Sequence, residues 1–224
     1  MIGTQAPRIA ESLFGSPRSV VLGFAPPYSK APTALSWASE AAFELAIHNV
    51  WIPSTVTTVM YDPENWPSTP ERERLDPVAA MQAFSLAARA HGYRVILTPH
   101  PSLMTVPGGL CTVGAGEAIE AAYVRCDIAG QAARYADVVE TQAQYLEADP
   151  SAYGDFVSTT AAQARAANPD VLVISGLSTN FVNSPAALYA AWFAVRDVVD
   201  GHYLSVPGGR RYAVAIGFLR LLPR

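Results

Sequence analysis

The sequence predicts an α/β protein in which parallel strands alternate with helices, and three observations support this prediction. Short runs rich in β-branched and aromatic residues alternate with longer Ala-rich amphipathic stretches. The ends of the predicted strands lie roughly 30 to 40 residues apart, the period of a repeated strand–helix unit. The helical stretches begin at recognisable N-cap residues that are followed by proline. We therefore expect a TIM-barrel-like (β/α) barrel with an incomplete set of strands, forming one domain over residues 1–224.

Six segments carry a strand pattern, and a seventh carries a weaker one. Strand, helix and strand in repetition favour parallel strands with right-handed crossovers. A complete barrel of this kind needs eight strands, so the count predicts an incomplete one. The six segments are 19–25, 56–62, 93–99, 137–144, 170–177 and 202–207, and the weaker one is 212–218.

The helix starts are marked by an acid or hydroxyl residue before proline. Asp76-Pro77, Asp149-Pro150 and Ser184-Pro185 each predict an N-cap with proline in the first turn. Apolar residues then recur at helical spacing, which predicts one buried face for each helix. Two such faces are Val78, Met81, Phe84 and Ala88, and, earlier in the chain, Phe43, Ala46, Ile47 and Val50.

An open doubly wound parallel sheet is the alternative architecture. Its usual dinucleotide signature is absent, because the first strand leads into GFAPPYSKAP and not into G-x-G-x-x-G. The chain also has no Walker-type phosphate loop. The sequence VPGG occurs at 106–109 and again at 206–209, and we interpret both copies as turns beyond a strand. We expect no cofactor, and polar residues at many strand ends favour the barrel.

Composition limits the partners and the compartment. Charged residues make up 15% of the chain and the net charge is −4, without a basic block, so we expect no nucleic-acid partner. The apolar runs are too short to predict a membrane span. Cys111 and Cys126 either close a disulfide from a loop onto the following helix or stay as two free thiols. The chain is then either a cytoplasmic protein or, if the disulfide forms, a secreted one that has lost its signal peptide.

The predicted site lies at the carboxyl ends of the strands, where both architectures bind ligands. Asp62 and Glu64 follow the strand 56–62 and share one side of it if the chain stays extended through Pro63. Two carboxylates so close repel each other, which favours a protonated group able to act as a general acid. The alternative is a turn, in which Ser68 and Glu71 form a capping box for the next helix.

Polar residues on one face of the strand 137–144 predict the wall of a polar pocket. Glu140, Gln142 and Gln144 alternate with apolar neighbours and therefore point to the same side. A parallel strand covered by helices is normally apolar on both faces, and each buried unpaired polar group costs about 1 to 3 kcal/mol. The alternative is a strand that ends at Glu140 and is followed by a solvated loop.

Further candidates lie at other strand ends. His100 follows the third strand between two prolines, Asn180 follows the fifth, and Tyr203 lies in the sixth. His48 and His91 fall near helix ends and are interpreted as structural. Ser178 does not lie in a G-x-S-x-G elbow, so a Ser-His-acid triad is not predicted. The histidines are too scattered for a metal site, and we expect none.

The stretch TVMYDPENW resembles the carboxylate-bearing strand end of (β/α)-barrel glycoside hydrolases, especially chitinase-like ones. That motif is D-x-D-x-E, in which the last Glu is the general acid and the preceding Asp orients a substrate amide. Asp62 and Glu64 match the last two positions, and Met60 occupies the first. The resemblance implies that Glu64 is the acid, Asp62 its neighbour and Trp66 a platform for a sugar ring.

The leading hypothesis is a barrel-type hydrolase that acts on a small-molecule glycoside or another carbohydrate. Glu64 would be the acid and Glu140 the second carboxylate, a pair that needs a separation of about 5 to 9 Å. One alternative is a lyase, cyclase or isomerase that uses the same acid on a less polar molecule. Another is a non-catalytic barrel that binds a ligand. The positioning or substrate-binding groups in the leading hypothesis are Asp62, Trp66, His100, Gln142, Gln144, Asn180 and Tyr203.

Overall fold

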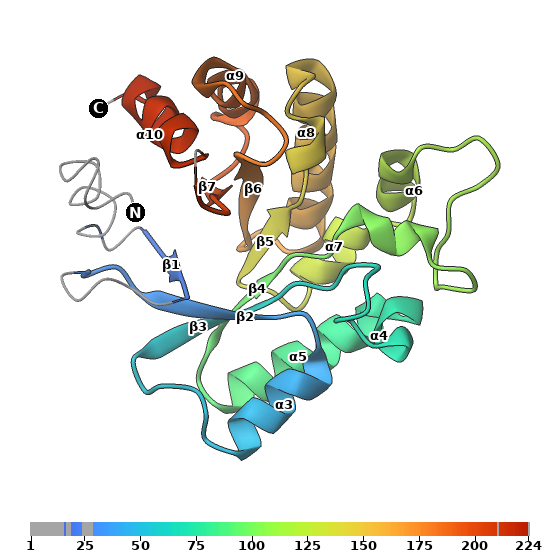
Figure 1. Ribbon diagram of the computed structural model, residues 1–224. Coiled ribbons are helices and arrows are strands. Elements are labelled where there is room, and N and C mark those ends of the chain that lie inside the picture. The colour runs from blue at the N-terminus through green and yellow to red at the C-terminus, as the bar shows by residue number, and fades with distance from the viewer. Residues whose placement is uncertain (1–15, 17–18, 24–28, 210, 224) are drawn as a thin grey trace.

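The part of the chain that the structure describes folds around one curled sheet of seven parallel strands (Figure 1). The structure, a computed structural model, describes residues 16, 19–23, 29–209 and 211–223. The strands are hydrogen-bonded in the order of the chain, from β1 to β7. They are β1 (Val21–Leu22), β2 (Thr33–Trp37), β3 (Val56–Tyr61), β4 (Arg94–Leu97), β5 (Val138–Thr141), β6 (Leu172–Ser178) and β7 (Gly201–Ser205).

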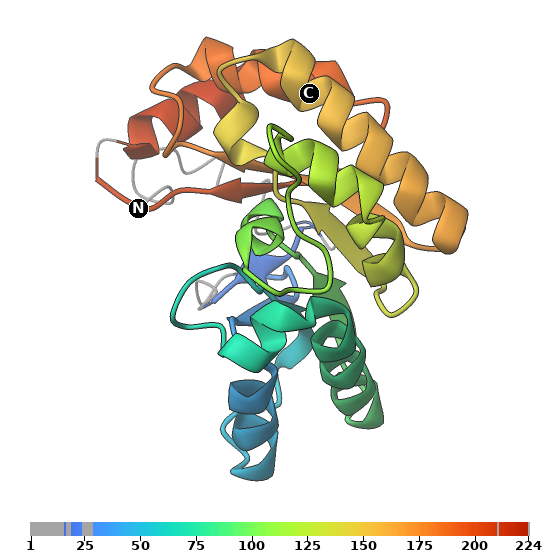
Figure 2. The same cartoon turned by 90° about the vertical axis from the view of Figure 1, so that its right-hand side faces the viewer.

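The helices lie between the strands in sequence and outside the curved sheet in space (Figures 1 and 2). The α-helices are α3 (Glu40–His48), α4 (Glu71–Leu75), α5 (Pro77–Ala90), α6 (Ile119–Arg125), α7 (Ile128–Ala133), α8 (Pro150–Ala167), α9 (Pro185–Val195) and α10 (Arg211–Leu221). Two short 3₁₀ helices follow strands β4 and β5: η1 (Pro101–Thr105) and η2 (Gln144–Leu146).

The strand order distinguishes the two predicted architectures. In a doubly wound sheet the order reverses at a switch point, and helices cover both faces. Here each strand pairs with the next one in the chain, so every right-handed crossover moves in the same direction and places its helices on the same face. Seven such strands form a curled half-barrel, which confirms the predicted incomplete TIM-barrel-like class.

Successive side chains of each strand point in turn to the face of the sheet that the helices cover and to its inner, concave face. Tyr61 of β3 packs on Phe84 of α5, with ring centroids 5.0 Å apart, and Phe84 packs on Phe43 of α3. Burying one such aromatic side chain contributes about 1.5 to 3 kcal/mol. Met60 and Asp62, the neighbours of Tyr61, therefore point to the inner, concave side of the sheet.

One strand was missed, and three predicted strand segments differ clearly from the structure in extent or type. Strand β2 was missed, because TALSW is short and lies between Pro32 and the Ser39 N-cap. The segment 212–218 lies within helix α10, since a short run that is apolar on all sides does not reveal its period. Strand β5 ends at Thr141, three residues earlier than the predicted segment 137–144. In the predicted segment 19–25, the strand β1 covers only Val21–Leu22. Residues 24 and 25 lie outside the described residues.

The predicted proline-linked caps are confirmed. Asp76 accepts a hydrogen bond from the amide of Ala79, Asp149 from that of Ala152, and Ser184 from that of Ala186. The capping box at Ser68 and Glu71 is wrong, because Pro70 occupies the N-cap of α4 and no side chain caps that helix.

The apolar helix faces are largely as predicted, except at Val50. Met81, Phe84 and Ala88 are buried on α5. Val50 lies beyond the end of α3, with a φ of 55° and 86% of its side chain exposed. The helix stops at His48, so Val50 cannot continue its apolar face.

A disulfide joins Cys111, in the loop after η1, to Cys126 at the end of α6. It decides between the two interpretations of these cysteines, because neither is a free thiol. Closing a loop of this size contributes about 3 kcal/mol by restricting the unfolded chain. None of the helices in the described part of the chain combines the length and the apolar character that a membrane crossing requires.

Candidate active site

Three carboxyl groups, those of Asp62, Glu64 and Glu140, lie near the carboxyl ends of β3 and β5 and influence one another electrostatically. Burial raises the pKa of Asp62 to about 6. Burial, and next the charge of Asp62, raise the pKa of Glu64 to about 7. Burial, the charge of Asp62 and then that of Glu64 raise the pKa of Glu140 to about 8. The structure thus brings together the three carboxyl groups that the sequence analysis singled out.

Asp62 is held by an amide from the segment after β5. The Gln142 side-chain nitrogen donates to Asp62 Oδ1 at 2.6 Å and to the carbonyl oxygen of Thr98 at 2.8 Å. The backbone of Asp62 donates to the carbonyl of Trp37, which continues the pairing of β2 and β3 beyond the strand end. The bond from Gln142 favours the ionised carboxylate and lowers the pKa of Asp62 against the effect of burial.

Glu140 is the most deeply buried of the three, with 2% of its surface exposed. Its Oε1 atom has no hydrogen-bond partner among the residues that the structure describes. The Thr98 hydroxyl lies close enough to lower the pKa of both Glu140 and Asp62, yet it makes no hydrogen bond of standard geometry. Buried polar atoms without partners inside a protein indicate a place for water or a ligand.

Gly176 of β6 makes room for the polar groups of β5. A Cβ atom at this position would lie 2.7 Å from Glu140 Oε1 and 2.6 Å from the side-chain amide of Gln144. Glu140 and Gln144 therefore both approach Gly176, whereas the side chain of Gln142 reaches Asp62 and Thr98. The three residues do not share a strand, because β5 ends at Thr141 and Gln144 begins η2.

The segment between β3 and α4 is fixed by hydrogen bonds around Thr69. The Glu64 amide and the Trp66 indole nitrogen both donate to the Thr69 hydroxyl, at 3.2 and 3.0 Å. The next loop also holds it, since the Asn65 amide donates to Ser102 Oγ. Glu64 is half-buried and the Trp66 side chain is 40% exposed, so both are accessible from solvent.

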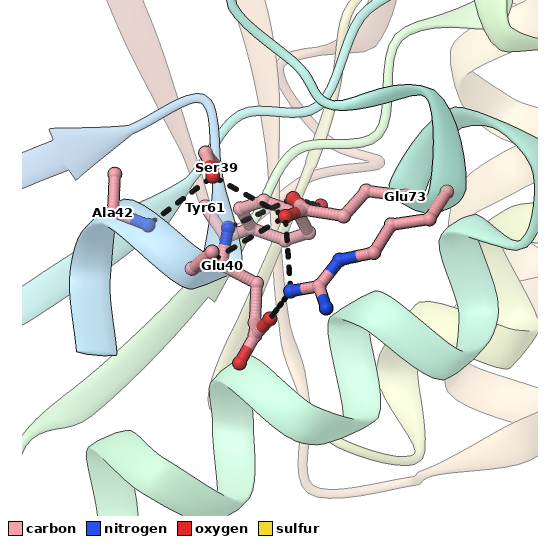
Figure 3. A network of polar contacts seen from close by, with 7 residues as sticks. Ser39, Glu40, Ala42, Tyr61 and Glu73 are labelled. Carbon is pink, nitrogen blue, oxygen red and sulfur yellow. Dashed lines mark hydrogen bonds and ion pairs between the residues drawn. The ribbon is translucent and has the colours of Figure 1, made fainter. Parts of the chain in front are cut away.

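A second hydrogen-bond network, centred on Glu73, holds both ends of the segment between β3 and α4 (Figure 3). Tyr61, the residue before Asp62, donates its hydroxyl to Glu73 Oε2 at 2.8 Å. The same carboxylate accepts from the Glu40 amide at 2.8 Å and from the Ser39 hydroxyl at 3.2 Å, at the start of α3. Glu73 is 2% exposed and therefore depends on these donors. The segment from Asp62 to Arg72 is thus closed at its base by one buried side chain.

The remaining predicted residues differ in how they relate to the carboxyl groups. Tyr203 of β7 lies opposite Gly176 in the sheet, and burial, then the charge of Glu140 and, more weakly, that of Asp62 raise the pKa of Tyr203. His100 Nδ1 accepts from the amide of Ser102 and caps η1, and burial lowers the pKa of His100 to about 4. Asn180 is exposed in the turn after β6. No hydrogen bond in the described part of the chain joins Trp66, His100 or Asn180 to the three carboxyl groups.

Sequence reasoning missed Gly176 and Glu147. The role of Gly176 depends on its register opposite β5, which the sequence does not give. Glu147 follows η2, its side chain is fully buried, and it accepts a hydrogen bond from the backbone amide of Ser178. Neither residue carries a periodic signal. Among the described residues, no three His, Cys, Asp or Glu side chains, the three carboxyl groups included, are placed so that they could hold one metal ion.

Comparison with known proteins gives a likeness of fold alone. No model of a known protein family matches the sequence, and no curated protein matches it. The fold is similar to that of a crystal structure described as a putative alpha-L-fucosidase from Bacteroides thetaiotaomicron VPI-5482. The TM-score is 0.54 and the sequence identity 8%. The likeness covers 85% of this chain, which spans 66% of that chain's length, just under two thirds.

Proposed function

We propose that the protein is a hydrolase that cleaves a glycosidic bond by acid/base chemistry of carboxyl groups. The observation that carries this proposal is the set of Asp62, Glu64 and Glu140, whose pKa values are about 6, 7 and 8 at one strand-end edge. Neighbouring carboxyl groups with separated pKa values are the usual arrangement for one acid and one base. The likeness in fold to a structure described as a fucosidase agrees with this proposal.

The pKa order suggests a role for each group. Between about pH 6 and pH 7, Asp62 is mainly ionised and Glu64 mainly protonated. Glu64 donates its proton to the glycosidic oxygen as that bond breaks. The Asp62 carboxylate stabilises the positive charge that develops on the sugar or takes a proton from the attacking water. Glu140 stays protonated and can donate a hydrogen bond from the floor of the site.

In this assignment Asp62 is the second carboxylate, the partner of the acid Glu64, whereas the sequence alone suggested Glu140 for that role. The physical reason is the environment of each group. The Gln142 amide stabilises the charge on Asp62, whereas Glu140 is the more deeply buried and faces two other carboxyl groups. Gln144, Tyr203 and the exposed ring of Trp66 are proposed to contact the sugar, and His100 and Asn180 to line the rim.

A panel of chromogenic 4-nitrophenyl glycosides tests the proposal. We expect the wild-type protein to release nitrophenol from at least one sugar at pH 6.5. We expect Glu64→Gln to reduce kcat on a glycoside with a poor leaving group by about 10²- to 10⁴-fold, because the amide cannot donate the catalytic proton. Glu71→Gln, a matched change of an exposed carboxylate on α4, should leave kcat unchanged.

Two outcomes would contradict the proposal. Unchanged turnover by Glu64→Gln of the glycoside with the poor leaving group would remove Glu64 from the chemistry. Binding of a sugar without turnover, seen as a ligand-induced rise in Tm, would favour a non-catalytic binding protein instead.

The disulfide bears on where the protein works. A bond between Cys111 and Cys126 persists in an oxidising environment and is rare in the cytosol. We therefore propose an oxidising compartment or the cell exterior.

A further inference from the structure

Strand β6 extends beyond its neighbour β5, and this leaves backbone groups without strand partners. The pairing of the two strands ends where Thr141 lies opposite Ser175, and β6 continues to Ser178. Even-numbered residues of β6 face β5, as the bond from the Leu172 amide to the Asp137 carbonyl shows. The carbonyl of Gly176 and the amide of Ser178 therefore point to the side that β5 has left.

Two side chains take the place of the missing strand. The Tyr153 hydroxyl, from α8, donates to the carbonyl of Gly176 at 2.9 Å. Glu147 Oε1 accepts from the amide of Ser178 at 2.5 Å. Leaving either backbone group buried and unpaired would cost about 1 to 3 kcal/mol.

Glu147 also ends the segment that carries the site's amide groups. The segment 142–147 leaves β5, turns through η2 and returns to β6 at Glu147. At its start, Gln142 bonds to Asp62 and to Thr98, and in its middle, Gln144 packs against Gly176. The bond from the Ser178 amide to Glu147 is therefore an anchor of this segment on β6.

We propose that Glu147 is a positioning residue, whose hydrogen bond to the Ser178 amide holds the segment 142–147 so that Gln142 stays bonded to Asp62. The catalytic meaning of this link rests on the proposed function, but the link itself does not. Burial raises the pKa of Glu147 to about 8, so the group is neutral at pH 7 and anchors through its carbonyl oxygen. An amide oxygen can do the same, which makes Glu147→Gln the conservative variant.

The link is tested by ¹³C NMR titration of the Asp62 carboxyl, assigned through its absence in Asp62→Asn. We expect a midpoint near 6 in the wild type and in Glu147→Gln. In Glu147→Leu, which has no acceptor, the midpoint should rise by about half a pH unit or more, because Asp62 loses the Gln142 bond that favours its charge. Gln142→Leu should raise it similarly, and Glu71→Leu should not.

Glu147→Asp, one methylene shorter, replaces Glu147→Leu if that variant does not fold. The proposal is overturned if the midpoint stays at its wild-type value in the anchor variant, whether or not Gln142→Leu moves it. A hydrolase would in addition lose kcat in the anchor variant and keep it in Glu147→Gln. A midpoint that moves as expected in a protein without glycosidase activity would retain the anchor and reject the proposed function.

Discussion

Asp62, Glu64 and Glu140 differ in their surroundings, and these surroundings set their order of ionisation. All three lose solvation, but Asp62 alone accepts the Gln142 amide. Glu140 faces the charges of both Asp62 and Glu64, and its pKa is the highest. Groups so close titrate as a set, and the measured midpoints belong to the set as a whole.

The pH dependence of kcat/KM follows from this order. In the proposed mechanism, activity requires an ionised Asp62, so kcat/KM should rise with pH through a midpoint near 6. It also requires a protonated Glu64, so it should fall through a midpoint near 7. The result is a narrow bell-shaped dependence of kcat/KM on pH, measured from pH 4 to 9 on the glycoside that the wild type cleaves fastest. An alkaline limb that survives in Glu64→Gln would show that another group is the acid.

At the scale of single residues, the sequence indicates which polar side chains lie near the carboxyl ends of strands β3 and β5. Asp62, Glu64, Glu140 and Gln142 were found because strand ends and side-chain parity are visible in the sequence. Gly176 and Glu147 could not be found this way, since their contacts depend on the register of β6 and on where β5 stops.

Among the elements, the short helix α4 holds β3 and α3 together through a single carboxylate. The Glu73 carboxylate accepts hydrogen bonds from four residues: Tyr61, and Ser39, Glu40 and Ala41 at the N-terminus of α3. A negative charge there also suits the positive end of the helix dipole. The network therefore supports the base of the segment that carries Asp62 and Glu64 (Figure 3).

Glu73→Gln should destabilise the protein by about 2 to 4 kcal/mol. The glutamine NH₂ group would point at buried N–H and O–H donors that now bond to the Glu73 carboxylate, and some of these donors would be left without an acceptor. Urea unfolding followed by circular dichroism measures the change. Glu71→Gln, on the exposed side of the same helix, should change the free energy of unfolding by less than about 0.5 kcal/mol. Equal stability of the two variants would show that the network is not a structural anchor.

Local chemistry decides which elements the sequence can predict. Helices α5, α8 and α9 begin where an N-cap residue precedes proline, and all three starts were predicted. Strand β2 and helix α10 were not, because β2 is five residues long and α10 is apolar without a clear period. Their types are set by neighbours in the folded chain: β2 by pairing with β1 and β3, and α10 by packing against α9.

At the scale of the whole molecule, the half-barrel gathers residues from distant parts of the sequence. The strands follow one another around the curve, so their carboxyl ends meet at one edge although Asp62 and Gln142 are 80 residues apart. The class of the fold was predictable from the repeated strand–helix period. How far the curved sheet closes was not predictable, because the degree of curvature arises from the packing of the strands and their helices.

The central claim is that a glycoside binds between the carboxyl ends of β3 and β5. A crystal structure of Glu64→Gln soaked with the glycoside that the wild type cleaves tests this most directly. We expect the glycosidic oxygen within hydrogen-bond distance of the side chain at position 64, with the sugar ring facing Asp62. A sugar bound elsewhere, for example in the shallow groove lined by Val124, Leu146 and Phe156, with the strand ends empty, would contradict the claim.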